Sequence, residues 1–230
     1  MANFENIKEL TLKKEGGLAR TTTDTASQNA SPCVHNGLTG WHTNKGVQWI
    51  VFKDFSKKFG YEASCDNFIN MPYNIWYKIA KNGYWDELNL DNLKNDGVAF
   101  QLFSWHWGRG YGFYTRLKNY LSSKGVSWDG KSSTMANAIN QLIDKQGEKQ
   151  TIDDLTEVQK KDYTAISQPA NIRGWINRIE DTTKYAYTFI GKKVSQIYSD
   201  NKKKINYTII GVGLIALSFF AWKQYKKLNK

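Results

Sequence analysis

Glu15 has the setting that best suits acid catalysis, because Gly16 and Gly17 follow it at the predicted end of a helix. Two glycines would let a polymer approach the backbone closely. A carboxylic acid in a partly apolar cleft can protonate the oxygen of a glycosidic bond as that bond breaks. Position alone does not establish this role, since a solvated surface acid is the more common situation.

A second carboxylate often acts as base or nucleophile in glycoside hydrolysis. Its candidates here are Asp24, Asp54, Asp66 and Asp86. None of them has a distinctive spacing from Glu15, so the sequence leaves the choice open.

Other chemistries lack their motifs. Cys33 and Cys65 do not form a Cys-x-x-Cys pair, and the histidines do not form His-x-x-x-His, so we expect no metal site. The sequence also has no nucleophile elbow, phosphate-binding loop or dinucleotide fingerprint, and we expect no cofactor. The two cysteines could form a disulfide or remain free thiols.

The densest aromatic stretch runs from Trp105 to Tyr111 and also contains Trp107, Gly108 and Gly110. Indole faces can stack on sugar rings, and the glycines would open space beside them. Trp105 and Trp107 are two residues apart, so on a helix they point in different directions. We expect one to lie in the core and the other to face a cleft.

Hydrophobic periodicity predicts a mainly α protein. Helices are expected over 3–14, 47–59, 73–81, 92–107, 115–123, 132–145, 153–166 and 175–199. Asn3 is the expected N-cap of the first helix. The strongly apolar segment 92–107 is the expected buried central helix, and residues 21–45 are expected to form a long loop.

The segment 205–222 contains no charged residue over 18 positions. As a helix it would extend roughly 27 Å, close to the ~30 Å hydrocarbon core of a bilayer. Lysines flank both ends, which favours a transmembrane helix over a buried core helix but leaves its orientation open. The first ten residues lack the apolar stretch of a signal peptide, so none is expected.

Most of the excess positive charge lies in this tail. The chain has a net charge of +11, and residues 201–230 contribute seven lysines and no acid, which leaves +4 for the rest. Lysines beside an apolar segment suit lipid headgroups. The remaining charge is mild, so we expect no nucleic-acid partner, although an anionic wall polymer would be compatible.

Four stretches, in order and at similar spacing, resemble motifs of the glycoside hydrolase family 108 muramidases. They are Glu15-Gly16-Gly17, Thr43-Asn44-Lys45-Gly46-Val47, Tyr84-Trp85-Asp86, and Val98-Ala99 followed by Trp105-x-Trp107-Gly108-x-Gly110. Downstream, Trp128-Asp129-Gly130-Lys131 with Thr134, and Gly174-Trp175-Ile176-Asn177-Arg178, are similar to the peptidoglycan-binding segment paired with that family.

The resemblance implies a lysozyme-like helical fold and cleavage of the β-1,4 bond between N-acetylmuramic acid and N-acetylglucosamine. It makes Glu15 the catalytic acid, with Asp24 as a further candidate and Thr43 as a hypothetical water-positioning residue. Substrate contacts are expected from Gly16, Gly17, Asn44, Gly46, Trp105, Trp107, Gly108 and Gly110. The chain departs from the family at Ser104, where the family has Asp, and in the longer interval that contains Asp24.

The expected organisation is a catalytic domain over 1–124, a helical peptidoglycan-binding-like extension over 125–200, and a membrane segment over 201–230. The leading interpretation is a muramidase anchored in a phage virion membrane or a bacterial inner membrane, degrading the wall locally during entry or lysis. Hydrolase and lytic transglycosylase both remain open. A non-catalytic wall-binding or structural membrane protein on a lysozyme fold is the alternative, and a nucleic-acid packaging factor ranks last.

Overall fold

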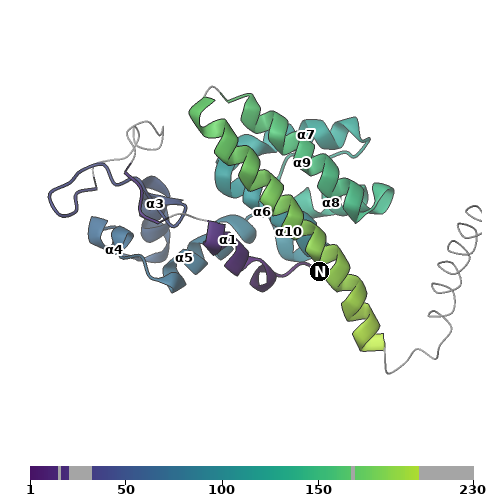
Figure 1. Cartoon of the computed structure of the whole chain (residues 1–230), viewed down its shortest axis with the longest axis horizontal. Coiled ribbons are helices and arrows are strands. Elements are labelled where there is room, and N and C mark those ends of the chain that lie inside the picture. The colour runs from purple at the N-terminus through teal and green to yellow at the C-terminus, as the bar shows by residue number, and fades with distance from the viewer. Residues whose placement is uncertain (15–16, 21–32, 167–168, 202–230) are drawn as a thin grey trace, which may run out of the picture. The chain divides into compact units, whose positions relative to one another are not determined.

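The computed structural model describes residues 1–14, 17–20, 33–166 and 169–201 (Figure 1). Backbone contacts divide the chain into a compact unit over Met1–Ile190 and a second unit over Gly191–Lys230. No described helix is both long and apolar enough to cross a bilayer. The predicted membrane segment 205–222 lies outside the described residues.

The chain is mainly helical, as predicted. The first half contains η1 (Phe4–Asn6), α1 (Lys8–Lys14), β1 (Thr43–Asn44), β2 (Val47–Gln48), α3 (Trp49–Phe59), α4 (Cys65–Ile69), α5 (Tyr73–Ala80), η2 (Lys81–Trp85) and η3 (Leu90–Asn92). The second half contains α6 (Asp96–Arg109), η4 (Gly110–Gly112), α7 (Phe113–Ser123), α8 (Ser132–Gln146), α9 (Glu148–Thr164) and α10 (Pro169–Asn201). Within residues 1–190, α6 lies between α3–α5 on one side and α7–α9 on the other (Figure 1).

Helix α6 is the buried central helix that its apolar sequence predicted. Asn95 caps its start by accepting a hydrogen bond from the Val98 amide at 2.9 Å. Its apolar side chains are fully or almost fully buried, among them Val98, Ala99, Phe100, Leu102 and Phe103. The helix ends at Gly110, whose positive φ of 53° terminates the helical path.

A buried polar cluster joins α6 to α9 and α10. The Gln101 amide donates hydrogen bonds to Thr156 and Thr183, each at 3.0 Å, and accepts one from Gln159. All four side chains are buried. Because buried polar groups are costly unless paired, this network fixes the packing of the three helices.

The strand pair was not predicted, because two-residue strands are too short to show alternation. Strands β1 and β2 are antiparallel, with Thr43 opposite Gln48 and Asn44 opposite Val47. Lys45 and Gly46 form the turn, with φ of 50° and 77°. Positive φ at both central residues is typical of a type I′ hairpin, which explains the glycine.

Most predicted helices are confirmed, although their observed first and last residues differ from the predicted ones by a few positions. Asn3 caps the first turn as expected, accepting a hydrogen bond from the Glu5 amide at 3.0 Å. Helix α4 was missed, since its five residues are too few for a periodic pattern. Helix α9 begins at Glu148, five residues before the predicted start.

Candidate active site

Glu15, Gly16 and Asp24 lie outside the described residues, but the segments that border Glu15 and Gly16 are placed. Helix α1 ends at Lys14. Beyond Gly16, the Ala19 amide donates to the Thr43 carbonyl at 2.8 Å, and the His42 amide donates to the Ala19 carbonyl at 3.2 Å. This short pairing joins the segment after Glu15 to the strand that carries Thr43.

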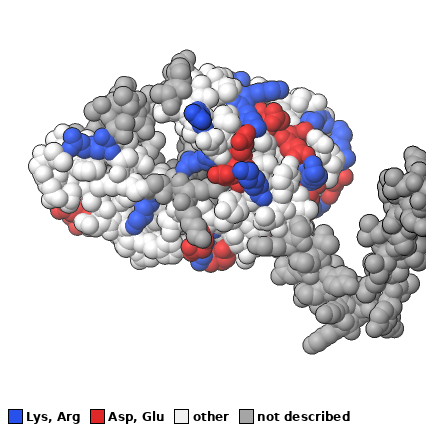
Figure 2. All heavy atoms as spheres, viewed as in Figure 1, with Lys and Arg blue, Asp and Glu red and all other residues white. Residues whose placement is uncertain are grey.

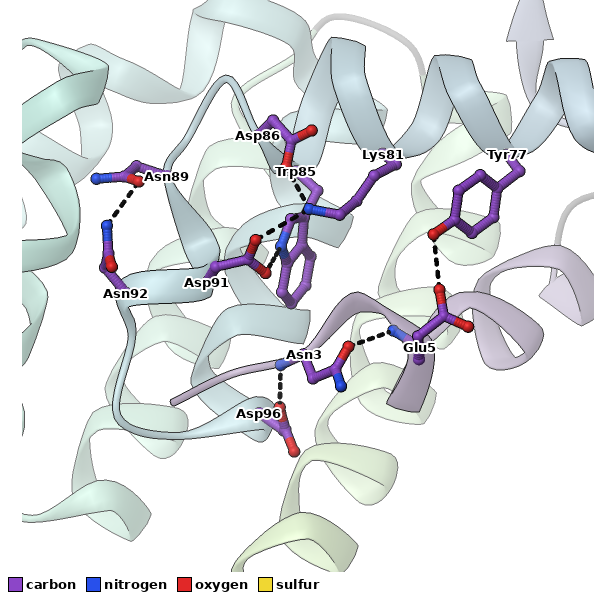
Figure 3. Close-up of polar contacts among 10 residues, drawn as sticks. All are labelled: Asn3, Glu5, Tyr77, Lys81, Trp85, Asp86, Asn89, Asp91, Asn92 and Asp96. Carbon is purple, nitrogen blue, oxygen red and sulfur yellow. Dashed lines mark hydrogen bonds and ion pairs between the residues drawn. The ribbon is translucent and has the colours of Figure 1, made fainter.

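The N-terminal segment leading to Glu15 is anchored by both apolar and polar contacts. Phe4 and Ile7 are buried. The Asn3 amide donates to Asp96 at 2.7 Å, and the Tyr77 hydroxyl donates to Glu5 at 2.6 Å (Figure 3). The bond to Glu5 raises the pKa of Tyr77 to about 12, so this phenol stays a donor at neutral pH. Helix α1 therefore starts from a fixed base on α5 and α6.

Asp86, one candidate second carboxylate, lies in the connection between α5 and α6. It accepts a hydrogen bond from Lys81, which also donates to Asp91 at 3.0 Å (Figure 3). The Trp85 indole donates to the other Asp91 oxygen at 2.6 Å. Trp85 and Asp86 of the motif thus help to fix this connection through hydrogen bonds and ion pairs.

The hairpin presents Thr43 and Asn44 differently. Thr43 is half-buried, and its hydroxyl oxygen lies 2.9 Å from Nδ1 of the buried His42. Asn44 is buried, and its amide donates to the carbonyls of Phe68 at 2.7 Å and Ile69 at 2.9 Å. Thr43 therefore remains partly accessible to solvent, while the Asn44 side chain holds α4 against the hairpin.

The glycines predicted to contact substrate occupy different settings. Gly17 is exposed, and a Cβ there would meet nothing within 4 Å. Gly46 forms the hairpin turn, and Gly110 ends α6. At Gly108 a Cβ would lie 2.1 Å from the Tyr163 hydroxyl, so that glycine permits close packing of α9 on α6.

Cys33 and Cys65 form a disulfide, which settles the question that the sequence left open. It joins the residue after segment 21–32 to the first residue of α4. Beside it, His35 Nδ1 lies 3.4 Å from a carboxylate oxygen of Asp66, another candidate acid. Within the described ranges, no cluster of His, Cys, Asp and Glu is arranged to hold a metal ion.

Trp105, on one face of the end of α6, is fully buried. Its indole donates to Asp162 on α9 at 2.9 Å, leaving no surface for a sugar ring. Asp162 also accepts from Arg109 at 2.9 Å and pairs with Arg116 at 3.3 Å. A buried carboxylate with this many donors is a structural junction between α6, α7 and α9.

The opposite side of α6 is more open. Trp107 is half-buried, with ring centroids 4.7 Å from Tyr84 and 6.2 Å from Trp76. Its indole nitrogen is buried and has no hydrogen-bond partner among the described residues. Trp105 and Trp107 thus occupy different environments, as their spacing predicts.

Two further residues on this side were missed from the sequence. Glu87 directly follows the Tyr84-Trp85-Asp86 motif, and one of its oxygens lies 3.5 Å from Nε2 of His106. Tyr111 is 72% exposed, and its ring makes an edge contact with His106 at a centroid distance of 5.7 Å. The flanking glycines Gly110 and Gly112 were the available signal for an exposed tyrosine at this turn.

A groove of about 460 Å³ lies between α7 and α9, lined by residues that include Arg116, Lys124, Asp154 and Glu157. Lys124 pairs with Asp154 at 2.6 Å inside it. Acidic and basic side chains are interspersed over the part of the molecule that contains α7–α9, whereas the face over α3–α5 carries fewer charges (Figure 2). The visible surface of the helical half is therefore mixed in charge.

Comparison with known proteins decides the enzyme class. The family model described as Glycosyl hydrolase 108 matches residues 8–110, from the start of α1 to the end of α6. Residues 8–110 form a glycosyl hydrolase 108 domain. The chain is therefore a glycosidase, and its substrate class is peptidoglycan.

A solved structure, described as the structure of Brucella abortus SagA, is similar to this glycosidase at 18% sequence identity with a TM-score of 0.61. The similarity covers 81% of this chain and 94% of SagA. It therefore extends beyond the glycosyl hydrolase 108 domain and shows a shared fold. No curated protein matches the chain.

Proposed function

We propose that this glycosidase is an N-acetylmuramidase that cleaves the β-1,4 bond between N-acetylmuramic acid and N-acetylglucosamine, with Glu15 as its acid. The observation that carries the proposal is the glycosyl hydrolase 108 match over 8–110, which contains Glu15-Gly16-Gly17 and the Thr43 hairpin. Glu15 directly follows α1 and precedes Ala19 by four residues. Chain length alone keeps its Cα within about 14 Å of the Ala19 Cα, which lies beside Thr43.

In this mechanism Glu15 donates a proton to the bridging oxygen as the glycosidic bond breaks. A water molecule then attacks the anomeric carbon and releases a proton to solvent, giving a reducing N-acetylmuramic acid end. Thr43 would position this water, because the residue is half-buried and its hydroxyl oxygen lies 2.9 Å from His42 Nδ1. Asp24 remains the candidate second carboxylate.

Ser104 does not count against catalysis. Its hydroxyl lies 3.4 Å from the Thr182 hydroxyl on α10. An aspartate at this position would also lie beside α10, so its replacement by serine affects a helix contact. The departure from the family at Ser104 therefore lies at a contact between α6 and α10.

Mass spectrometry of the products tests the bond that is cleaved. The full-length protein, in detergent, would be incubated with purified peptidoglycan. Muropeptides with N-acetylmuramic acid at the reducing end are expected. Products ending in N-acetylglucosamine would contradict the proposal, and 1,6-anhydro ends would replace hydrolysis with transglycosylation.

Thr43 substitutions test the water-positioning role. Thr43→Val, which keeps the branched shape but removes the hydroxyl, should lower kcat by about 10²-fold, since misplacing a reactant costs that much. Thr43→Ser should retain most of kcat because the hydroxyl remains. Equal rates for the two variants would remove Thr43 from the mechanism.

We further propose that residues 125–200 help to hold the wall and that residues 205–222 anchor the enzyme in a membrane, of a phage virion or a bacterium. An anchored muramidase would cut only the wall within its reach. The 18 uncharged residues between lysine clusters support this anchor. Flotation with liposomes tests it: the full-length protein should float, and the double variant Leu214→Arg/Leu217→Arg should not. Equal flotation would contradict the anchor.

A further inference from the structure

Tyr111 is unusual among the described aromatic residues because it is exposed and yet held in place. It is 72% exposed, whereas Tyr73 and Tyr185 are each 40% exposed. Its ring makes an edge contact with His106 at 5.7 Å and lies 6.0 Å from Tyr114. His106 also contacts Glu87, with 3.5 Å between its Nε2 and a carboxylate oxygen. Contacts on its inner side thus fix a ring whose outer surface faces solvent.

A layered aromatic base supports this ring. Tyr114 stacks on the buried Trp128 at a centroid distance of 5.7 Å and an interplanar angle of 24°. The Trp128 indole in turn donates to the Lys131 carbonyl at 3.0 Å and to the Thr134 hydroxyl at 3.2 Å. Binding groups supported in this way by packed neighbours keep their geometry.

Glu87 supplies a charged acceptor beside the ring. Its side chain is 28% exposed. Burial alone would raise the pKa of this carboxyl, but hydrogen bonds from His106 and Tyr111 outweigh burial and lower the pKa, so Glu87 is ionised at neutral pH. His106 is almost fully buried, and its Nδ1 lies 3.1 Å from the Gly110 carbonyl oxygen. His106 therefore ties the carboxylate to the turn that carries Tyr111.

We infer that Tyr111 and Glu87 form a glycan-binding subsite that takes an N-acetylhexosamine ring. One face of a pyranose is lined by C–H groups and can lie on the exposed Tyr111 ring, while its hydroxyl or acetamido N–H groups donate to Glu87. Ligand sites commonly combine an apolar surface with a few polar groups that fix orientation. The inference rests on the proposed function for its substrate class, and it adds a binding site to the catalytic residues already named.

Binding can be measured separately from catalysis. Full-length protein carrying Glu15→Gln would be titrated with the neutral tetrasaccharide of β-1,4-linked N-acetylglucosamine by isothermal calorimetry. Tyr111→Ala added to it should weaken affinity about tenfold, and Glu87→Gln should weaken it by a smaller factor. Tyr111→Phe should retain much of the affinity because it keeps the ring. Tyr61→Ala, which changes an exposed tyrosine outside residues 125–200, should have no effect.

Equal affinity of the Tyr111→Ala and Tyr61→Ala proteins for the tetrasaccharide would overturn the subsite. So would an effect of Tyr111→Ala confined to amine-bearing stem peptides, because the pair would then bind an ammonium group. Failure of the wild type to cleave peptidoglycan, with tetrasaccharide binding still dependent on Tyr111, would overturn the muramidase proposal and support the subsite. The two failures are therefore distinguishable.

Discussion

Two carboxylates near the end of α6 serve different purposes because one is enclosed and the other is open. The Asp162 side chain is 1% exposed and is surrounded by donors from Trp105, Arg109 and Arg116. The Glu87 side chain is 28% exposed and contacts His106 and the exposed Tyr111. An enclosed charge mainly holds helices together, whereas an open one retains capacity for a ligand.

Helical geometry explains how one short segment builds both environments. Trp105, Gly108 and Arg109 share a face, since residues three and four apart are neighbours on a helix. His106 and Gly110 share a different face for the same reason. The dense aromatic motif therefore contributes to the core on one side and to a candidate binding surface on the other.

Asp162→Asn should give the largest loss of stability. It removes the buried charge that balances Arg109 and Arg116, and breaking such a pair costs about 3 kcal/mol or more. Chemical denaturation of the full-length protein would measure the change in unfolding free energy. Asp181→Asn, at an exposed ion pair with Lys184, serves as the control and should cost under about 1 kcal/mol. Equal losses would refute the enclosed role of Asp162.

Gly108→Ala should destabilise the protein by about 2 kcal/mol through overpacking against the Tyr163 hydroxyl. Tyr163→Phe removes that oxygen, so the double variant should be less destabilised than the sum of the two single changes. Gly83→Ala is the matched control, because a Cβ there meets nothing within 4 Å. Additive losses in denaturation would show that this contact is not the cause.

Asp154 provides an intermediate case through its pH dependence. Burial opposes its ionisation, but hydrogen bonds from Lys124, Gln150, Gln146 and Tyr120 lower its pKa to about 2. A lowered pKa stabilises the fold above the unfolded value near 3.8, and this contribution is lost as pH falls toward 2. Asp154→Asn should remove about 1–2 kcal/mol at pH 7 and much less at pH 2. A pH-independent difference in Tm would contradict this account.

Glu87→Gln should have the smallest effect on stability, under about 1 kcal/mol, because the group is partly solvated and its charge is screened. This loss of stability should decrease at acid pH. The lowered pKa of Glu87 means that its ionised carboxylate stabilises the fold, and this stabilisation is lost as the carboxyl is protonated. Thermal unfolding of wild type and variant at pH 7 and pH 3 would measure it. A loss of stability as large as that of Asp162→Asn would contradict the different roles given to the two carboxylates.

The sequence predicted the helices well because their hydrophobic faces repeat over many turns, and α6 is the clearest case. It did not predict the Thr43–Gln48 hairpin, whose pairing depends on a turn rather than on alternation. It also could not show that the Asn44 amide holds the end of α4, because that contact joins residues 24 and 25 positions apart.

The site was predicted in part. The motifs located Thr43 and the end of α6, but motif letters do not say which side chain faces the core. Trp105 lies in the core, where its indole donates to Asp162, a residue 57 positions away in the sequence. Tyr111 and Glu87 were overlooked because their proximity depends on packing around His106, which no local pattern reveals.

The measurement that tests the central claim most directly is peptidoglycan digestion by three full-length proteins: wild type, Glu15→Gln and Glu9→Gln. Glu9 lies on α1, six residues before Glu15 in the sequence, and is exposed, so its variant controls for loss of an acid from the same segment. Wild type and Glu9→Gln should release muropeptides at similar rates, and Glu15→Gln should be slower by at least about 10²-fold, the usual contribution of a general acid. Comparable release by Glu15→Gln would contradict Glu15 as the catalytic acid.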